Sequence, residues 1–296
     1  MPTMSAPTPR SGIALYLAAL VTFASFDAAM KHLLNFYPAP FLNVMRYLSV
    51  TTIGVGLLIR HGWPRWESTA DKGLLLARGL ALGSVGTCFM TALIWMPLSE
   101  ATAIYFTSPL IVVALSPWLL GERVGLRQWA AVALGCTGML LIVRPGGDLP
   151  WLGSSLMAIA AVSYAIFQVL TRRLSGRVPS HVQYASTAVI CLIVTALPAP
   201  FFLPQPWPDA ADWAFIIFMG VVNGVGQILL IAAFNRVPAS TLAPFNYCHL
   251  LMAVAFSTFL FNRPPDLLAM AGMTLIVVAG MSLLTRSPGS GPAPAR

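Results

Sequence analysis

The chain has 296 residues, of which 57% are hydrophobic, and its mean hydropathy is +0.79. Charged residues make up only 9% of the chain, whereas soluble domains carry about 25%, so a soluble protein is excluded. The net charge of +8 comes from basic residues scattered singly between apolar runs, which fits membrane loops and argues against a nucleic-acid-binding face.

The apolar runs are long enough to be membrane-spanning helices. A helix needs about 20 apolar residues to cross a bilayer core of about 30 Å. The polar, Pro-rich ends at 1–12 and 287–296 are predicted to be disordered, and the first run is too long for the apolar part of a cleaved signal peptide. In chain order we expect helices at 13–33, 39–59, 73–95, 99–119, 126–143, 152–173, 181–202, 212–234, 238–260 and 266–284.

The Lys and Arg residues predict the orientation of these helices. With the N-terminus in the cytoplasm, twelve basic residues fall in cytoplasmic segments. Only Lys31, Arg144 and Arg263 fall in outer segments. Cytoplasmic segments of membrane proteins carry the excess of Lys and Arg. Both termini are therefore expected in the cytoplasm, and the protein in a bacterial-type inner membrane.

Shifting the sequence by about 141 residues aligns its two halves. "GLALG" at 79–83 matches "GVVNG" at 220–224, and "DAAMKHL" at 27–33 matches "QVLTRRL" at 168–174. Two further matches, "GER" with "FNR" and "TGMLLIVR" with "AGMSLLTR", have offsets of 140 and 142. Four ordered matches indicate an internal repeat.

Each half of the chain holds five expected helices, and five is odd, so the second half enters the membrane from the opposite side. Such inverted repeats are typical of secondary transporters. The expected fold is therefore an all-α integral membrane protein with ten transmembrane helices, arranged as two inverted five-helix repeats at 13–146 and 147–286.

Three segments resemble a known family. They are "PLSEATAIYFTSPLIVVALSPWLLGERV" at 97–124, "GCTGMLLIVRPG" at 135–146 and "AVSYAIFQVLTRRL" at 161–174. They are similar to the drug/metabolite transporter superfamily, in particular its ten-helix EamA-type members, and the resemblance covers roughly 12–286. It implies two five-helix repeats and a complete pathway in one chain, so that a monomer suffices. Family members export amino acids, drugs or metabolites, and some import riboflavin or S-adenosylmethionine. The start "FASFDAAMKHL" looks more like the metabolite branch.

Ionisable residues inside the expected helices mark candidate sites, because a charge in hydrocarbon costs about 2.5–3.5 kcal/mol on insertion scales. Asp27 lies in the first helix with Lys31 one turn further on, and Arg46 lies in the second helix. An Asp27–Arg46 or Asp27–Lys31 pair would gate the outer half or hold a charged solute. The alternative is a static pair that ties the first two helices together.

Polar and aromatic residues recur on several of the expected helices. A single amide is explained equally well as a hydrogen-bonding contact between helices, but the whole set fits the wall of a central cavity. His249 is the only His deep in an expected helix, and it serves either proton coupling or a structural hydrogen bond. The candidate solute-binding residues are Asp27, Trp95, Tyr105, Tyr164, Gln168, Asn223, Gln227, Asn246, Tyr247 and His249.

Two prolines predict breaks at equivalent places in the repeat. Pro109 and Pro244 cannot donate a backbone hydrogen bond, so we expect kinks that line the cavity or act as hinges. Arg78, one turn into the third helix, is expected to reach the cytoplasmic headgroups. Glu100 is expected to stabilise a helix N-terminus, with proton coupling as the alternative. The Gly-x-x-x-Gly pairs predict close helix packing.

These features together predict a secondary transporter that moves a small organic metabolite by alternating access. Its partners are the solute and membrane lipids, without nucleic acid. A phosphate-binding "GxxxxGK[ST]" loop is absent, so a proton gradient, solute exchange or the solute's own gradient drives it. The alternatives are an integral-membrane enzyme and a channel, which need a clustered reactive set or rings of like charge. Neither occurs in the sequence, so we expect no catalytic residues, metal or cofactor.

Overall fold

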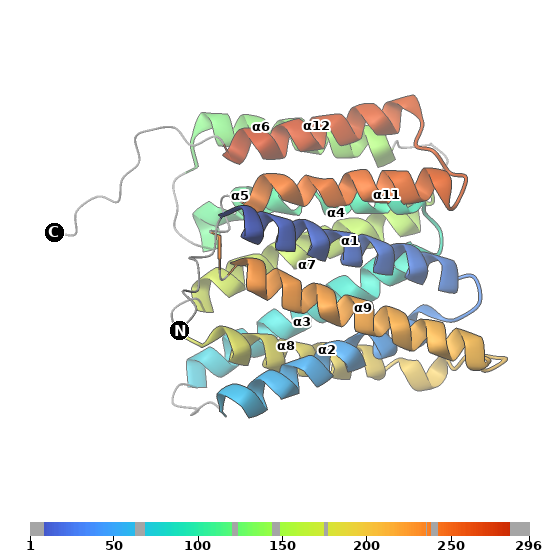
Figure 1. Cartoon of the computed structure of the whole chain (residues 1–296). Helices are drawn as coiled ribbons and strands as arrows, with labels where there is room; N and C mark the ends of the chain where they lie inside the picture. The colour runs from blue at the N-terminus through green and yellow to red at the C-terminus, as the bar shows by residue number, and fades with distance from the viewer. Residues whose placement is uncertain are drawn as a thin grey trace.

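A computed structural model describes residues 9–62, 69–119, 124–143, 149–174, 177–234, 236–237 and 242–284. In these ranges the regular structure consists only of helices, which pack side by side in one bundle (Figure 1). The α-helices are α1 (Pro9–Leu33), α2 (Ala39–His61), α3 (Thr69–Ala92), α4 (Leu98–Tyr105), α5 (Ser108–Leu119), α6 (Leu126–Val143), α7 (Trp151–Leu174), α8 (Ser180–Ala196), α9 (Ala210–Phe234), α11 (Tyr247–Phe259) and α12 (Leu267–Leu284). Two short 3₁₀ helices are η1 (Ala199–Phe201) and η2 (Ala243–Asn246).

Most of these helices have the length and composition of membrane spans. Within the described ranges, eight segments qualify, and α4 and α5 together count as one of them, Leu98–Leu119. Two shorter apolar helices, Tyr247–Phe259 and Leu267–Leu283, follow at the end of the chain. The prediction of an all-helical membrane protein is confirmed. The turn that holds Glu122 and Arg123 and the expected tail 287–296 lie outside the described residues.

Several observed helices have bounds that differ from the expected ones. Within the described residues the first helix starts at Pro9 rather than at residue 13, so 9–12, expected to be disordered, are helical. The helix expected to reach residue 202 ends at Ala196, and η1 follows. Pro198 and Pro200 lack the N–H groups that would continue it.

The expected kink at Pro109 is a complete break of the helix. The α-helical pattern stops at Tyr105 and restarts at Ser108. Pro109 cannot donate to the carbonyl oxygen of Tyr105, and the chain bridges the gap with short turns, such as Thr107 N–H to Ile104 O at 3.1 Å. In the second half, the 3₁₀ turn η2 contains Pro244 and precedes α11. The backbone is irregular at both expected places.

The bundle is built from helix pairs that join the first half of the chain to the second. Helices α6 and α12 pack together at one edge, the top in Figure 1, and α2 and α8 pack together at the opposite edge. Between these edges, α3 packs against α7 and α1 packs against α9. Each of these pairs therefore contains one helix from each half of the chain.

The two Gly-x-x-x-Gly pairs occupy tight helix contacts, as predicted. A Cβ atom at Gly79 would lie 2.6 Å from Cβ of Ile190, and one at Gly224 would lie 2.6 Å from Cδ1 of Ile53. The first pair therefore faces α8 and the second faces α2. Such close approach requires residues without a side chain.

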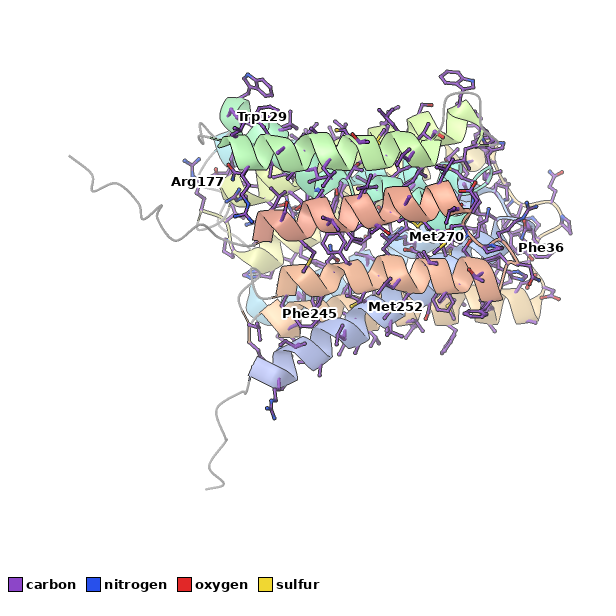
Figure 2. All side chains as sticks on the ribbon, turned by 90° about the horizontal axis from the view of Figure 1, so that it is seen from above. Phe36, Trp129, Arg177, Phe245, Met252 and Met270 are labelled. Atoms are coloured by element: carbon purple, nitrogen blue, oxygen red, sulfur yellow. The ribbon has the colours of Figure 1, made fainter. Side chains whose placement is uncertain are left out.

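The two ends of the bundle are built differently. We call the end at which α1 begins and α12 ends the termini end, and the end that carries Phe36 the distal end (Figure 2). A large buried cluster fills the distal half, with Leu33, Phe41, Met90 and Leu98 among its members. These residues come from the end of α1, the start of α2, the end of α3 and the start of α4, so the distal half is closed by apolar packing.

Candidate functional site

A cavity of about 390 Å³ lies inside the bundle, on the termini side of the apolar distal cluster. Helix α1 lines it with residues between Tyr16 and Asp27, and α6 and α12 supply no lining residue. The lining residues are Tyr16, Leu20, Phe23, Asp27, Arg46, Tyr47, Val50, Arg78, Leu82, Tyr105, Phe106, Ser108, Pro109, Tyr164, Phe167, Gln168, Tyr184, Thr187, Ala188, Cys191, Asn223, Gln227, Leu230, Asn246 and His249.

The structure brings most of the candidate residues to this cavity. Eight of the ten candidate solute-binding residues line it, and so do Arg46 and Pro109. The two that do not are Trp95, which is 43% exposed after the end of α3, and Tyr247. The Tyr247 ring packs 5.8 Å from that of Phe106, and its hydroxyl lies against Gly280. The side chain of Pro244 lies outside the described residues.

Asp27 pairs with His249 rather than with either of the partners expected from the sequence. The distance from His249 Nε2 to Asp27 Oδ2 is 3.4 Å. Lys31 instead donates hydrogen bonds to the carbonyl oxygens of Leu93 and Met96, the latter at 3.1 Å. Those carbonyl groups follow the last turn of α3, where a cation is favourable. Lys31 therefore joins α1 to the distal end of α3 and does not line the cavity.

Arg46 lies in the cavity wall against aromatic rings. Its guanidinium carbon is 5.1 Å from the centroid of the Phe26 ring and 5.7 Å from that of Tyr47. Stacking on aromatic faces is a favourable arrangement for guanidinium groups. Within the described residues, Arg46 has no carboxylate within ion-pair distance.

Arg78 was expected at the headgroups, and that expectation is wrong. Its residue is only 8% exposed, because α3 packs between α7 and α8. Nε donates to Oγ1 of Thr171 at 2.8 Å. Nη1 donates to the backbone oxygen of Gln183 at 2.7 Å and to the hydroxyl of Thr187. The guanidinium carbon also lies 4.4 Å from the centroid of the Phe167 ring.

A chain of aromatic contacts forms one wall of the cavity. The His249 ring stacks on Phe106 at 5.9 Å between centroids, and Phe106 contacts Tyr105 at 6.2 Å. Tyr105 lies 4.9 Å from Tyr164, which stacks on Phe167 at 5.7 Å. Aromatic pairs at these separations are attractive. The wall therefore runs from the Asp27–His249 pair to the ring beneath Arg78.

Several buried polar atoms of the cavity residues have no hydrogen-bond partner within the described residues. They are Nδ2 and Oδ1 of Asn223, Nδ1 of His249 and the hydroxyl of Tyr184. Asn223 is only 1% exposed. A buried polar group without a partner costs about 1–3 kcal/mol, so these atoms favour a polar solute. In the described part of the chain, no three His, Cys, Asp or Glu residues gather to hold a metal ion.

The cavity lining follows the internal repeat. Eight pairs of lining residues are separated by 141 positions, the offset of the two halves. Equivalent helices of the two halves therefore present the same positions to one space. The pairs are Phe23 and Tyr164, Asp27 and Gln168, Arg46 and Thr187, Tyr47 and Ala188, Val50 and Cys191, Leu82 and Asn223, Tyr105 and Asn246, and Ser108 and His249.

Polar contacts join the two halves at the distal end. Tyr37, between α1 and α2, donates a hydrogen bond to the carboxylate of Asp212. That bond, together with burial, raises the pKa of Tyr37 to about 12. Ser99 donates to Glu100 at 2.5 Å, and its hydroxyl lies 3.1 Å from that of Ser257 on α11. Glu100 is in the first turn of α4, as expected, and is 8% exposed.

Comparison with known proteins agrees with this arrangement. The chain is 27% identical over 284 residues to the pseudopaline exporter CntI of Pseudomonas aeruginosa (strain UCBPP-PA14), covering 93% of this chain and 96% of that protein. It is 23% identical over 275 residues to the S-adenosylmethionine uptake transporter of Rickettsia bellii, covering 92% and 93%. It is 26% identical over 262 residues to the riboflavin transporter of Brucella anthropi, covering 86% and 90%.

A solved crystal structure has the same fold. It superimposes with a TM-score of 0.63 at 19% identity and covers 93% of this chain and 97% of its own. The model of the EamA-like transporter family matches the chain twice, at residues 10–144 and at residues 151–285. Since these two matches span nearly all of the helical bundle, the protein belongs to the EamA-like transporter family and is a multi-pass membrane transporter.

Proposed function

We propose that this protein moves a small organic metabolite across the bacterial inner membrane by alternating access. The observation that carries the proposal is the cavity of about 390 Å³, which lies inside the bundle beside a closed distal half. Cavities of 300–1,000 Å³ accommodate small organic ligands. The named relatives export pseudopaline or transport S-adenosylmethionine and riboflavin, which supports a metabolite as the solute.

The chain crosses the membrane ten times, as two inverted five-helix repeats with both termini in the cytoplasm. The two family matches and the lining pairs 141 residues apart support the repeat. The tight glycine contacts support it as well. Gly79 packs against Ile190 and Gly220 against Ser49, and both members of one contact are shifted by 141 from the other. The Lys and Arg distribution supports the orientation.

In this arrangement the described conformation faces the cytoplasm. The cavity lies on the termini side, and the distal contacts Tyr37–Asp212 and Ser99–Ser257 hold the outer end closed. Because the halves are inverted copies, the outward-facing state forms when each half adopts the conformation of the other. The distal contacts then break. The helix break before Pro109 and the turn η2 provide the hinges.

Counterflow into proteoliposomes tests the proposal. Vesicles are loaded with unlabelled S-adenosylmethionine, riboflavin or amino acids, and uptake of the labelled form is measured. Alternating access predicts that at least one internal solute accelerates uptake of its labelled form, and that Trp95→Ala, outside the cavity, leaves this unchanged. Flux without acceleration would instead indicate a channel, and product formation an enzyme.

A further inference from the structure

Two guanidinium groups in the cavity wall have no carboxylate partner in the part of the chain that the structure describes. Arg46 and Arg78 both line the cavity, and within the described residues neither has a carboxylate within 4.0 Å. Among the described lining residues, Asp27 is the only acidic one, and its carboxylate lies beside His249. The α2 and α3 side of the cavity is therefore positively charged, and the Asp27 carboxylate on α1 already has His249 as its partner.

The buried charge of Arg78 is costly in the absence of an anion. Hydrogen bonds to neutral groups replace only part of the hydration that a buried cation loses, and an opposite charge supplies the rest. Arg78 is 8% exposed, and its contacts to Thr171, Gln183 and Thr187 are all to neutral oxygen atoms. A solute carboxylate in the cavity would neutralise the positive charge of Arg78, which hydrogen bonds to neutral oxygen atoms cannot do.

The geometry of Arg78 leaves donors for such an anion. A guanidinium group has five N–H groups, and the protein contacts use those of Nε and Nη1. The two N–H groups of Nη2 have no partner among the described residues. Arg46 occupies the position equivalent to Thr187, 141 residues earlier, on α2, which packs against α8. Arg78 lies on α3 and donates to Gln183 and Thr187 of α8, so both guanidinium groups lie on helices that pack against α8.

We propose that the transported solute carries a carboxylate, which binds Arg78 and Arg46, and a planar group, which lies on the aromatic wall of Phe106, Tyr105 and Tyr164. Asn223, with both amide atoms buried and without a partner in the described protein, supplies a further polar contact. The proposal rests on the proposed function and names its substrate class as planar organic carboxylates, including zwitterions.

Binding to the purified protein in detergent tests this assignment. The probes are nicotinate, kynurenate and indole-3-acetate, each compared with its carboxamide, and the measurement is the thermal unfolding midpoint as a function of probe concentration. At least one carboxylate raises the midpoint and its carboxamide does not. Arg78→Gln and Arg46→Gln weaken that binding about 10- to 100-fold, as expected for lost charged hydrogen bonds. Arg60→Gln, an exposed cation outside the cavity, leaves it unchanged.

A near-isosteric pair of variants keeps the test independent of the Arg substitutions. Thr187→Asp places a carboxylate beside the Arg78 guanidinium. It should therefore raise the unfolding midpoint in the absence of probe and abolish the effect of the added carboxylate probe. Thr187→Asn has a similar volume without the charge, so the difference between Thr187→Asp and Thr187→Asn measures the effect of the charge alone. The assignment is overturned if no acid raises the midpoint, if acid and carboxamide act equally, or if Thr187→Asp still responds to the acid. Failure of counterflow with intact binding would overturn the transport proposal alone.

Discussion

Asp27 on α1 and His249 on α11 lie side by side in the cavity wall, with 3.4 Å between Oδ2 of the carboxylate and Nε2 of the imidazole. The two residues come from opposite halves of the chain. Their contact therefore depends on the relative position of the halves, which the proposed alternating access would change. The imidazole is also the first ring of the aromatic wall, through its stacking on Phe106.

This pair predicts that both side chains are needed for exchange. Each of the two residues is the other's polar partner across the two halves, so removing one leaves the other without it. Asp27→Asn and His249→Gln should therefore each lower exchange about tenfold or more. Counterflow of labelled solute measures the effect, with Trp95→Ala as the control outside the cavity. Wild-type rates in both variants would remove the pair from the mechanism.

The aromatic wall predicts that ring shape, rather than the Tyr164 hydroxyl, sustains solute affinity. Tyr164→Phe keeps the ring that lies 4.9 Å from Tyr105 and should leave the half-saturating concentration nearly unchanged. Tyr164→Leu removes the ring and should raise that concentration about 3- to 10-fold. Concentration-dependent exchange measures this, with Trp95→Leu as the control outside the cavity. Equal effects of Phe and Leu at position 164 would contradict the prediction.

The α6–α12 contact predicts that replacing either of two glycines destabilises the protein. A Cβ at Gly138 would lie 2.6 Å from the backbone oxygen of Gly272, and one at Gly272 would lie 2.5 Å from that of Gly138. Because a backbone atom cannot rotate away, Gly138→Ala or Gly272→Ala should cost about 1–3 kcal/mol and lower the thermal unfolding midpoint. Gly56→Ala, with nothing within 4 Å, is the matched control. A drop as large in Gly56→Ala would show that the contact is not the cause.

The distal contact of Tyr37 with Asp212 predicts a gate. Tyr37→Phe removes the hydrogen bond and should speed labelling of a Leu42→Cys reporter from outside the cell on the order of 10-fold, in a chain without its native cysteines. Leu42 is 0% exposed in the closed distal half. Asn35→Ala, which removes a local hydrogen bond to His32 at the same end, should not change the rate. Unchanged labelling in Tyr37→Phe would contradict a gating role.

The pKa of Tyr37 predicts how the gate responds to pH. In the folded protein this pKa is about 12, above the ordinary value of 10.0. The hydrogen bond therefore contributes its full stability below about pH 10 and loses it as the pH rises through about 12. Labelling of the Leu42→Cys reporter should be constant between pH 6 and pH 9. A change in that range that Tyr37→Phe abolishes would contradict this assignment.

Much of the candidate site could be predicted because polar residues in hydrocarbon are rare and costly. Asp27, Gln168, Asn223 and His249 stood out from apolar surroundings, and all four line the cavity. The break at Pro109 was predictable because proline cannot complete the helical hydrogen-bond pattern. Arg78 was misplaced because the sequence gives a residue's depth along its helix but not which neighbours cover it.

The sequence by itself determined the all-helical membrane architecture and the internal repeat. The lengths of the apolar runs and the positions of the prolines act locally, and the offset of 141 residues follows directly from comparing the two halves of the sequence. Only the tertiary structure decided which polar side chains contact one another. It places His249 beside Asp27, Lys31 against the carbonyl groups that follow α3, and the Arg78 side chain inside the bundle. Partner choice depends on helix rotation and on contacts between residues more than sixty positions apart, which local patterns do not encode.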